Sequence, residues 1–591
     1  MTKQTVILGI SAYYHDSAAA LVIDGEVIAA VQEERFSRIK HDDSFPSLSI
    51  QSVLSQTKVE ADAIDYVVFY EKPFVKFERL LETYFAYAPI GFKSFRKAIP
   101  IWLKDKLFQK SKIIKQLNNI SDNVDWASKL LFSDHHLSHA ASAFYPSPFS
   151  ESAILTIDGV GEWNTTTISY GKDNSIVKKE ELNFPHSLGL LYSTITTFLG
   201  FKVNSGEYKV MGLAPYGNPI FSDKILNELI DLKDDGSFRL NMSYFSFATD
   251  LKMATDKMAT FFGVEARKPE APLIQIHKDI AASLQVATEN IILKICSYVA
   301  KKIGSKNLCL AGGVALNCVA NAKIRESKLF DSIWVQPAAG DAGGAVGAAL
   351  AVYYLSLNKN RIISSHYNTY LGPEFCSDDI RNELNLCNAV YNFLKTEELL
   401  DFIASELAKG KIVGWMQGRA EFGPRALGNR SILADPRVQD LQKSLNLKIK
   451  FRESFRPFAP SVLAEETPTW FRTDSPSTYM GFVAQAQEVK KTQIPAVIHL
   501  DGTARLQTVT NNDNTLYYAL INKFFEKTGC PLLVNTSFNV RGEPMVLNPN
   551  DAFQCFMGTD IDILVIGNYV LHKTDQMKSS NHHYAKTFAP D

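Results

Sequence analysis

The chain has 591 residues, which is too many for one hydrophobic core, so we expect two to four domains. Its composition is that of an ordinary globular protein, and a formal net charge of −1 argues against nucleic acid as the main partner. The seven cysteines include no Cys-x-x-Cys pair, so they predict reduced core thiols rather than a disulfide framework.

Strand patterns fill the first forty residues. The run 5–10 is apolar, and the runs 18–25 and 26–32 predict a hairpin that turns at Asp24-Gly25. The N-terminal residues enter the first strand pattern directly and lack the layout of a signal peptide. We therefore expect a cytoplasmic protein that has no membrane partner.

The same design returns near the middle of the first half of the chain. Residues 153–158 and 165–170 predict two strands joined by a turn, and the strand 308–311 leads into Gly312-Gly313. Two strand–glycine–strand modules followed by a strand with a glycine pair predict a duplicated α/β fold. Folds of this kind bind a nucleotide between their two halves.

Helical periodicity marks the segments between these strands. Residues 75–130 and 220–300 read as helical insertions or crossovers, and 277–302 is the best amphipathic helix. The Gly- and Ala-rich run 342–358 is too short to span a bilayer comfortably, and we expect a buried helix that lets a neighbouring backbone approach closely. The turn-rich run 207–217 is expected to lie outside regular structure.

A domain boundary is predicted where the pattern weakens, around residues 355–375. We expect a first domain over 1–360 and a second over 366–591. The second domain opens with a helix predicted to run from Glu397 to Lys409, followed by a strand over 411–415.

The pair His135 and His139 is the most informative feature of the first domain. Histidines four apart lie on one face of a helix, so both imidazoles can reach one ion, whereas His136 points off that face. Asp158 and Asp341 each follow an apolar stretch that gives way to glycine. Together the four predict a metal site suited to Fe²⁺, Mn²⁺ or Zn²⁺, with a purely structural histidine pair as the alternative.

Other motifs of the first domain have equally simple alternatives. His15 and the aspartate after it follow the first strand and could position a hydroxyl for attack. The charged run 33–41 is best explained as a solvated face, with Lys40 near an acyl phosphate or adenylate as the alternative. Glu207 could contact a nucleotide or simply belong to a packed loop.

Glycine-rich loops offer two further candidate sites. Gly312 and Gly313 lack Cβ atoms where a flat ring or a phosphate must come close, although a tight turn explains them as well. The loop 340–347 places free N–H groups at the start of a helix, which favours an anion.

A series of arginines distinguishes the second domain. They are mixed with Pro, Gly and aromatic residues rather than spread along a helix face, and constrained arginines suit bidentate recognition of phosphate or carboxylate. An acyl phosphate and a triphosphate both meet that description. No P-loop, Gly-x-Ser-x-Gly elbow or His-Glu-x-x-His motif is present.

Taken together, the motifs resemble the O-carbamoyltransferase family of nodulation-factor and antibiotic biosynthesis. The resemblance covers nearly the whole chain. It rests on His15-Asp-Ser-Ala-Ala19, Glu33-Glu-Arg-Phe36, the His-x-x-x-His segment, Gly312-Gly313 with Asn317, the Gly-Pro-Arg-Ala-Leu-Gly block at 423–428, Arg456-Pro-Phe-Ala-Pro460 and Asn535-Thr-Ser-Phe-Asn539.

The resemblance implies two domains with separate tasks. The first is similar to the actin-like (ASKHA) ATPase domain of tRNA threonylcarbamoyl-adenosine enzymes, and the second to their YrdC-like adenylate-forming partner. Carbamoyl phosphate and ATP would give carbamoyl adenylate in the second domain. The carbamoyl group would then pass in the first domain to a hydroxyl of a small molecule, such as a sugar, an antibiotic or another alcohol.

The resemblance also implies residue roles. His15 would act as the base on the acceptor hydroxyl, and Lys40 would face the adenylate. His135, His139, Asp158 and Asp341 would hold the metal, for which we favour Fe²⁺ over Mn²⁺ or Zn²⁺, and ATP would enter with Mg²⁺. The nucleotide and carbamoyl phosphate would be held by Glu207, Gly312, Gly313, Asn317, Arg425, Lys450, Arg456, Arg505, Asn535 and Ser537.

Two alternative functions stay open at this point, a tRNA-modifying carbamoyl-adenylate enzyme and a non-catalytic actin-like nucleotide switch. The near-neutral charge disfavours the first, because tRNA binding depends on positive charge. The switch would need no arginine cluster. A homodimer is compatible with the sequence, which does not name the acceptor.

Overall fold

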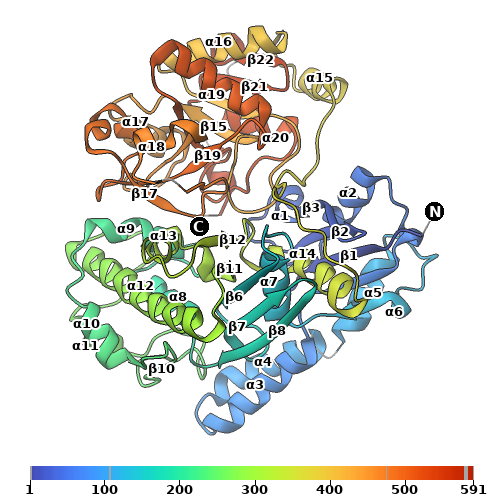
Figure 1. The fold of residues 1–591 in the computed structure, drawn as a ribbon, viewed down its shortest axis with the longest axis vertical. Coiled ribbons are helices and arrows are strands. Elements are labelled where there is room, and N and C mark those ends of the chain that lie inside the picture. The colour runs from blue at the N-terminus through green and yellow to red at the C-terminus, as the bar shows by residue number, and fades with distance from the viewer. Residues whose placement is uncertain (1–2, 106–107, 474, 578–583, 590–591) are drawn as a thin grey trace. The chain divides into compact units, whose positions relative to one another are not determined.

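The structure, a computed structural model, describes residues 3–105, 108–473, 475–577 and 584–589. It forms two compact units, the first made of residues 1–33 and 41–367 and the second of residues 34–40 and 368–591. Each unit combines sheets with helices, as the ribbon in Figure 1 shows, which confirms the predicted α/β class.

The first unit contains two five-stranded sheets with the same topology. Their orders are β3-β2-β1-β4-β5 and β12-β11-β6-β7-β8. The strands are β1 (Val6–Ser11), β2 (Ala18–Ile23), β3 (Glu26–Gln32), β4 (Tyr66–Phe69), β5 (Leu130–Phe132), β6 (Glu151–Ile157), β7 (Asn164–Lys172), β8 (Ser175–Asn183), β11 (Asn307–Ala311) and β12 (Ser332–Val335).

In each sheet the first strand pairs antiparallel with the hairpin that follows it and parallel with the next strand beyond. Thus β1 is antiparallel to β2 and parallel to β4, and β6 is antiparallel to β7 and parallel to β11. The repeated order confirms the predicted duplication, and it is the arrangement expected of an actin-like domain.

Two helices, α7 (His135–Phe144) and α14 (Asp341–Ala351), pack tightly against each other because their contact surfaces carry small residues. A Cβ atom on Gly347 would lie 1.7 Å from the backbone oxygen of Ser138, and one on Gly9 would lie 1.9 Å from that of Ala345. Only glycine fits at such close approaches. The buried, small-residue helix predicted from residue 342 onward is therefore confirmed.

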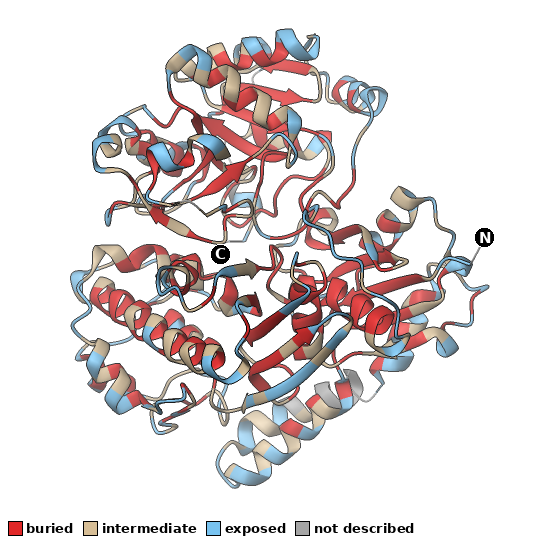
Figure 2. Cartoon of the chain, in the orientation of Figure 1, coloured by how far each residue is buried: buried red, intermediate tan, exposed pale blue. Residues whose placement is uncertain are grey.

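The helical segments of this unit are α3 (Pro73–Tyr87), α4 (Phe92–Asp105), α5 (Gln109–Asn118), α8 (Leu188–Phe198), α9 (Glu207–Leu213), α12 (Gln275–Ile303) and α13 (Cys318–Glu326). The predicted amphipathic helix at 277–302 corresponds to α12, whose buried side lies in the unit's interior (Figure 2). Across the described ranges, none of the helices combines the length and the apolar character needed to cross a bilayer.

The expectation that residues 207–217 lie outside regular structure was wrong. They form α9 and a 3₁₀ turn over Ala214–Tyr216. The segment packs so closely on α12 that a Cβ on Gly217 would lie 2.0 Å from the backbone oxygen of Lys278. Tertiary packing therefore overrides the turn-forming composition of this stretch.

The second unit is built on one eight-stranded mixed sheet with the order β13-β22-β21-β14-β15-β20-β16-β19. The strands are β13 (Asn392–Phe393), β14 (Val413–Met416), β15 (Arg430–Ala434), β16 (Ala459–Leu463), β19 (Gln507–Val509), β20 (Leu532–Ser537), β21 (Ile563–Ile566) and β22 (Tyr569–His572). A separate two-stranded sheet joins β17 (Val483–Gln485) to β18 (Thr503–Arg505).

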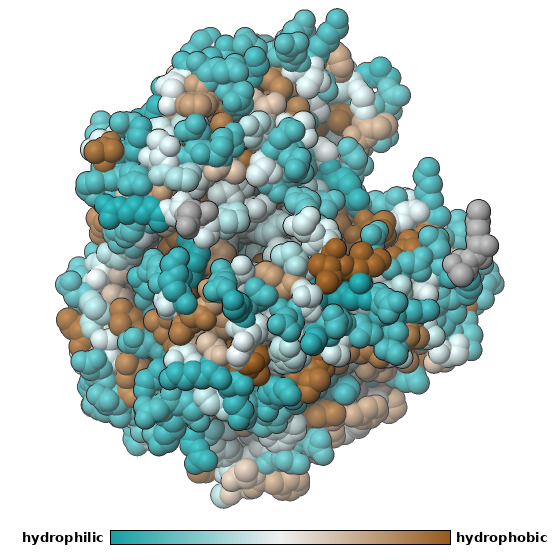
Figure 3. Space-filling model, in the orientation of Figure 1, coloured by the Kyte–Doolittle hydropathy of each residue, from teal (hydrophilic) through white to brown (hydrophobic). Residues whose placement is uncertain are grey.

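Apolar side chains from this sheet and its helices form one core that includes Trp415 and Phe524, both fully buried. The main helices are α16 (Thr396–Ala408), α19 (Thr515–Thr528) and α20 (Pro549–Met557). Helix α16 and strand β14 confirm the helix predicted from Glu397 to Lys409 and the strand predicted over 411–415. The face seen in Figure 3 is largely hydrophilic, with apolar side chains gathered in a few patches.

Residues 34–40 belong to the second unit although they lie near the N-terminus. The guanidinium of Arg35 donates to the backbone oxygen of Gly423 at 2.9 Å, and that of Arg38 donates to the carboxylate of Glu543 at 2.7 Å. The solvated face predicted for the run 33–41 was therefore wrong, since Glu33 and Arg35 are buried. The pairing partners lie about 400 to 500 positions away, beyond the reach of local pattern reading.

Candidate functional site

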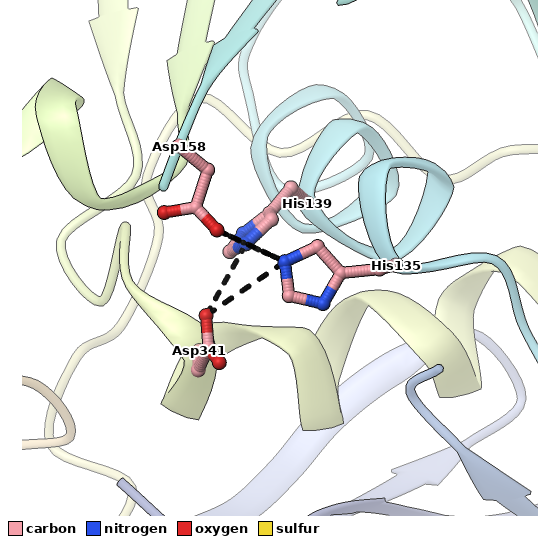
Figure 4. Close-up of side chains that lie close together, drawn as sticks. All are labelled: His135, His139, Asp158 and Asp341. Carbon is pink, nitrogen blue, oxygen red and sulfur yellow. Dashed lines mark hydrogen bonds and ion pairs between the residues drawn. The ribbon is translucent and has the colours of Figure 1, made fainter. Parts of the chain in front are cut away.

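The four predicted metal ligands converge in the first unit (Figure 4), where we call them the metal-ligand cluster. His135 and His139 come from α7, Asp158 directly follows β6, and Asp341 is the first residue of α14. Nε2 of His135 lies 3.0 Å from Oδ2 of Asp158 and 3.2 Å from Nε2 of His139. Nε2 of His139 lies 3.5 Å from Oδ1 of Asp341. One ligand atom from each residue thus falls within 4.8 Å of the others.

Local sequence explains why α7 presents two imidazoles here. The side chain of Asp134 caps the helix by accepting a hydrogen bond from the backbone N–H of Leu137, so the helix begins at His135. Residues 135 and 139 then share a face. Gly161 leaves room for the ring, because a Cβ there would lie 2.8 Å from Cδ2 of His135 and 2.9 Å from Cδ2 of His136.

Each carboxylate of the cluster has one oxygen fixed by the protein and the other directed toward the imidazoles. Oδ1 of Asp158 accepts from the backbone N–H of Gly313 at 2.9 Å, and Oδ2 of Asp341 accepts from the hydroxyl of Tyr70 at 3.2 Å. Such outer contacts orient metal ligands in proteins.

The electrostatics of the cluster fit a divalent cation. Burial opposes ionisation of Asp158, but its 3.0 Å hydrogen bond with His135 and the imidazole of His139, 3.7 Å away, hold its pKa well below the usual value. Burial likewise opposes the charge of His139, yet Asp158 and Asp341 raise its pKa to about 9. Protons on the imidazoles therefore balance the charge of the two buried carboxylates. A divalent cation bound between the same four side chains would balance that charge instead. Oδ1 of Asp341 is buried and has no hydrogen-bond partner among the described residues.

His15 lies beside this cluster, as expected for a residue acting on the same substrate. Its Nε2 is 3.7 Å from Oδ2 of Asp341, and its Nδ1 is 3.0 Å from Oδ2 of Asp16. Burial opposes its protonation, but the charge of Asp341 and the hydrogen bond to Asp16 raise its pKa to about 10.

The residues predicted to contact adenosine have local partners. Gly312 has a left-handed φ of 88°, and a Cβ on it would lie 2.3 Å from the backbone oxygen of Ile157. Asn317 caps α13 and exchanges hydrogen bonds with Gln285 of α12 at 3.0 and 3.2 Å. The carboxylate of Glu207 accepts from the hydroxyl of Ser193 at 2.7 Å. A nucleotide-binding role for these residues and for Gly313 stays a prediction.

In the second unit, Lys450 is the centre of a group that we call the lysine cluster, formed with Ser537 and Asn539. Its ammonium donates to the backbone oxygens of Ser537 and Asn539 at 2.6 and 2.8 Å and to the side-chain oxygen of Asn539 at 2.7 Å. All of these acceptors are neutral. Lys450 is 2% exposed, and burial lowers its pKa well below the usual value.

Other predicted ligands of the second unit are grouped around the same strand. Asn535 lies on β20 two residues before Ser537, so the two side chains share a face of the sheet. The Asn535 amide donates to the backbone oxygen of Ala426, the neighbour of Arg425, at 3.1 Å. It also donates to Gln507, two residues after Arg505, at 2.8 Å.

Arg456 and Lys40 complete the set. Arg456 lies 3.5 Å from the carboxylate of Glu453, which is 4.0 Å from the guanidinium of Arg541. The backbone N–H of Arg541 in turn donates to the backbone oxygen of Lys450. Lys40 is half-buried and ends the segment 34–40 of the second unit. Roles of all these residues in ligand binding are predictions.

Sequence reasoning missed three residues that support the clusters. Tyr70 directly follows the apolar strand β4, and a polar aromatic residue at that place is a usable signal of a site. The carboxylate of Glu162 accepts from the backbone N–H of His135 at 3.1 Å and from that of Lys72 at 2.7 Å. Asn539 belongs to a motif that was noted, but it was given no role.

Two family models match the chain. One described as Carbamoyltransferase N-terminus covers residues 6–350, and one described as Carbamoyltransferase C-terminus covers residues 404–573. A protein from Synechocystis sp. is 53% identical over 97% of both chains. Nodulation protein NolNO of Sinorhizobium fredii is 40% identical over 95% of this chain and 79% of its own length.

Solved structures are more distant. HypF of T. kodakarensis is 14% identical and covers 61% of this chain and 49% of its own, with a TM-score of 0.30. A similarity this weak supports no conclusion about function.

Proposed function

The chain belongs to the carbamoyltransferase family and is an enzyme of the O-carbamoyltransferase type that acts on a small-molecule acceptor, and we propose that it works in two half-reactions. In the first, the second unit forms carbamoyl adenylate from carbamoyl phosphate and ATP. In the second, the first unit transfers the carbamoyl group to a hydroxyl. Because the chain is an enzyme, the non-catalytic nucleotide switch is not retained.

The observation that carries the proposal is the pairing of His15 with the metal-ligand cluster. A half-buried imidazole that is hydrogen-bonded to Asp16 through Nδ1 and faces the carboxylate of Asp341 with Nε2 is placed to take a proton beside a bound cation. The separate lysine cluster supports a second, anion-binding step, since its charge is held by neutral acceptors.

The first half-reaction joins carbamate to AMP. Atom balance requires carbamoyl phosphate to lose phosphate by taking up water, after which a carbamate oxygen attacks the α-phosphorus of ATP and pyrophosphate leaves. Negative charge accumulates on phosphoryl oxygens in this step, and fixed cationic groups stabilise it best. Lys450, Arg425, Arg456 and Arg505 are the side chains that we propose for that role.

In the second half-reaction, the acceptor oxygen bonds to the carbamoyl carbon while AMP departs with its bonding electrons. His15 takes the hydroxyl proton on Nε2. A divalent ion held by His135, His139, Asp158 and Asp341 would polarise a carbonyl or phosphoryl oxygen. The charge of the ion would also offset that of Asp341, which raises the pKa of His15, and so would favour the neutral, basic form of this imidazole.

The first half-reaction is tested by incubating the protein with ATP, Mg²⁺ and carbamoyl phosphate. We expect carbamoyl adenylate in the chromatogram and a matching release of pyrophosphate. Absence of both products would contradict the proposal. A screen of alcohols that includes sugars and aminoglycoside-type compounds, read by mass spectrometry for an added carbamoyl group, then identifies the acceptor class.

A further inference from the structure

A second histidine, His41, is tied to the proposed base through a shared carboxylate. The carboxylate of Asp16 lies between two imidazoles, with Oδ2 3.0 Å from Nδ1 of His15 and Oδ1 2.7 Å from Nδ1 of His41. The exposed fractions of the three side chains are 19%, 20% and 25%, in the order His15, Asp16 and His41. The three groups thus form a hydrogen-bonded chain that is largely withdrawn from water.

The backbone at two of these three residues has an uncommon conformation. Asp16 and His41 have φ values of 52° and 58°, in the left-handed region that residues with side chains seldom adopt. Two backbone hydrogen bonds keep the two loops together, from Tyr13 N–H to Asp43 at 2.8 Å and from Ser17 N–H to Asp42 at 2.9 Å. Backbone conformations of this kind persist only where surrounding contacts enforce them, and they gather at functional sites.

The chemistry of the carboxylate decides which nitrogen of His15 carries a proton. An ionised carboxylate can only accept, so Nδ1 of His15 must donate to Asp16 and the neutral ring leaves Nε2 as the acceptor. That nitrogen is the one that faces Asp341 of the metal-ligand cluster, at 3.7 Å. His41 donates to the other oxygen of Asp16 and restricts the rotation of the carboxylate.

We propose that Asp16 and His41 are positioning residues, which fix the tautomer and orientation of His15 so that Nε2 meets the acceptor hydroxyl. The inference rests on the proposed role of His15 as base. When the hydroxyl proton moves to Nε2, the acceptor oxygen bonds to the carbamoyl carbon and AMP leaves. Asp16 stays ionised and stabilises the imidazolium, while its contact with His41 is maintained.

The first test is Asp16→Asn, which keeps the shape of the side chain but replaces one acceptor oxygen by an amide donor. We expect kcat for transfer to fall by about 100- to 10,000-fold, because an Asp→Asn change at a carboxylate that orients a catalytic histidine can lower kcat by about 10,000-fold. KM for the acceptor, the metal content and the release of pyrophosphate should stay at wild-type values. Asp43→Asn is the matched control, since it makes the same change on an exposed side chain of the adjoining loop.

The second test uses His41 and stands even if the Asp16→Asn protein is unstable. His41→Leu removes the donor to Asp16, whereas His41→Asn places an amide N–H near the position of Nδ1. We expect His41→Leu to lower kcat for transfer and His41→Asn to restore most of it. A merely structural role predicts no such rescue.

The proposal is overturned if Asp16→Asn and His41→Leu transfer at the wild-type rate, or if they lose metal in step with activity. Either result leaves the two proposed half-reactions standing. Pyrophosphate release is measured in the same proteins, and the need for His139 is measured in a separate variant. Loss of pyrophosphate release in the wild-type protein would instead contradict the proposed function itself.

Discussion

In the first unit, two carboxylates and two imidazoles face one another, whereas in the second unit the ammonium of Lys450 is surrounded by uncharged oxygens. Both groups are buried, and burying charge is costly unless it is compensated. When both of its imidazoles are neutral, the two carboxylates give the first cluster an excess of negative charge that suits a cation. In the second, burial lowers the pKa of Lys450 and its ammonium donates to neutral oxygens, so a bound anion would stabilise the charged form of this lysine. This difference supports the proposal that the two units carry out different chemical steps.

Removing a metal ligand should have the largest effect. It should abolish carbamoyl transfer by the first unit while leaving pyrophosphate release by the second unit unchanged. His139→Ala deletes one of two imidazoles, and we expect metal affinity to fall by more than about 100-fold, with loss of transfer, because even outer-sphere partners contribute 10- to 100-fold. Pyrophosphate release should persist. Metal analysis of the purified protein and the two product assays check this.

His136→Gln serves as a control for that experiment. It removes an imidazole from the same helix whose Nδ1 lies 2.7 Å from the hydroxyl of Thr156, outside the ligand set. We expect it to keep the metal. If His139→Ala retained both metal and transfer activity, the ligand assignment would be wrong even though the family is right.

A change in the lysine cluster should have the opposite effect, lowering pyrophosphate release without affecting metal binding. Lys450→Met keeps most of the volume and removes the charge, so we expect pyrophosphate release to fall by about 100- to 1,000-fold, as when one preorganised electrostatic donor is lost. The metal content should not change. Lys448→Met is the control, because Lys448 is close in sequence but exposed. Equal pyrophosphate release by the two variants would exclude Lys450 from the first half-reaction.

A smaller effect should follow from filling the space beside His135. Gly161→Ala places a Cβ 2.8 Å from that ring, and relieving the overlap should cost about 1–3 kcal/mol and displace a metal ligand. Gly159→Ala in the same loop meets only Leu190, at 4.0 Å, and should be tolerated. Thermal unfolding and metal titration of both variants compare them. Equal metal affinity would show that the ring can move without cost.

The smallest predicted change comes from Tyr70→Phe, which removes the 3.2 Å hydrogen bond to Asp341 without altering the packing of the ring. We expect metal affinity to drop by about 10-fold, the lower end of the range for an outer-sphere contact. Competition with a chromophoric chelator measures it. A drop as large as that of His139→Ala would indicate that Tyr70 does more than orient the carboxylate.

Much of the fold could be predicted from the local sequence, because hydrophobic periodicity marks individual helices and strands. The hairpins predicted at 18–32 and 153–170, helix α12 and the small-residue helix α14 each show their pattern within the element itself. The helix at 207–213 did not, because its stability comes from packing on α12. The assignment of residues 34–40 to the second unit was equally hidden, since their partners lie hundreds of positions away.

For the site, the sequence pointed to the four residues of the metal-ligand cluster, because a His-x-x-x-His pair and aspartates next to glycine are strong local signals. Asp158 follows a strand as expected, whereas Asp341 begins helix α14. The sequence placed Asp16 beside His15 but gave His41 no role. The carboxylate bridge between those two histidines depends on the meeting of two loops, which no spacing in the sequence reveals. Glu162 was missed for the same reason.

The central claim is that carbamoyl adenylate formation and carbamoyl transfer reside in separate units. The most direct measurement strips the wild-type protein of tightly bound metal, restores Mg²⁺ alone, and follows pyrophosphate release and acceptor carbamoylation side by side. We predict full pyrophosphate release with no transfer, and recovery of transfer when Fe²⁺, Mn²⁺ or Zn²⁺ is added. Undiminished transfer by the stripped protein, or parallel loss of both activities, would contradict the account.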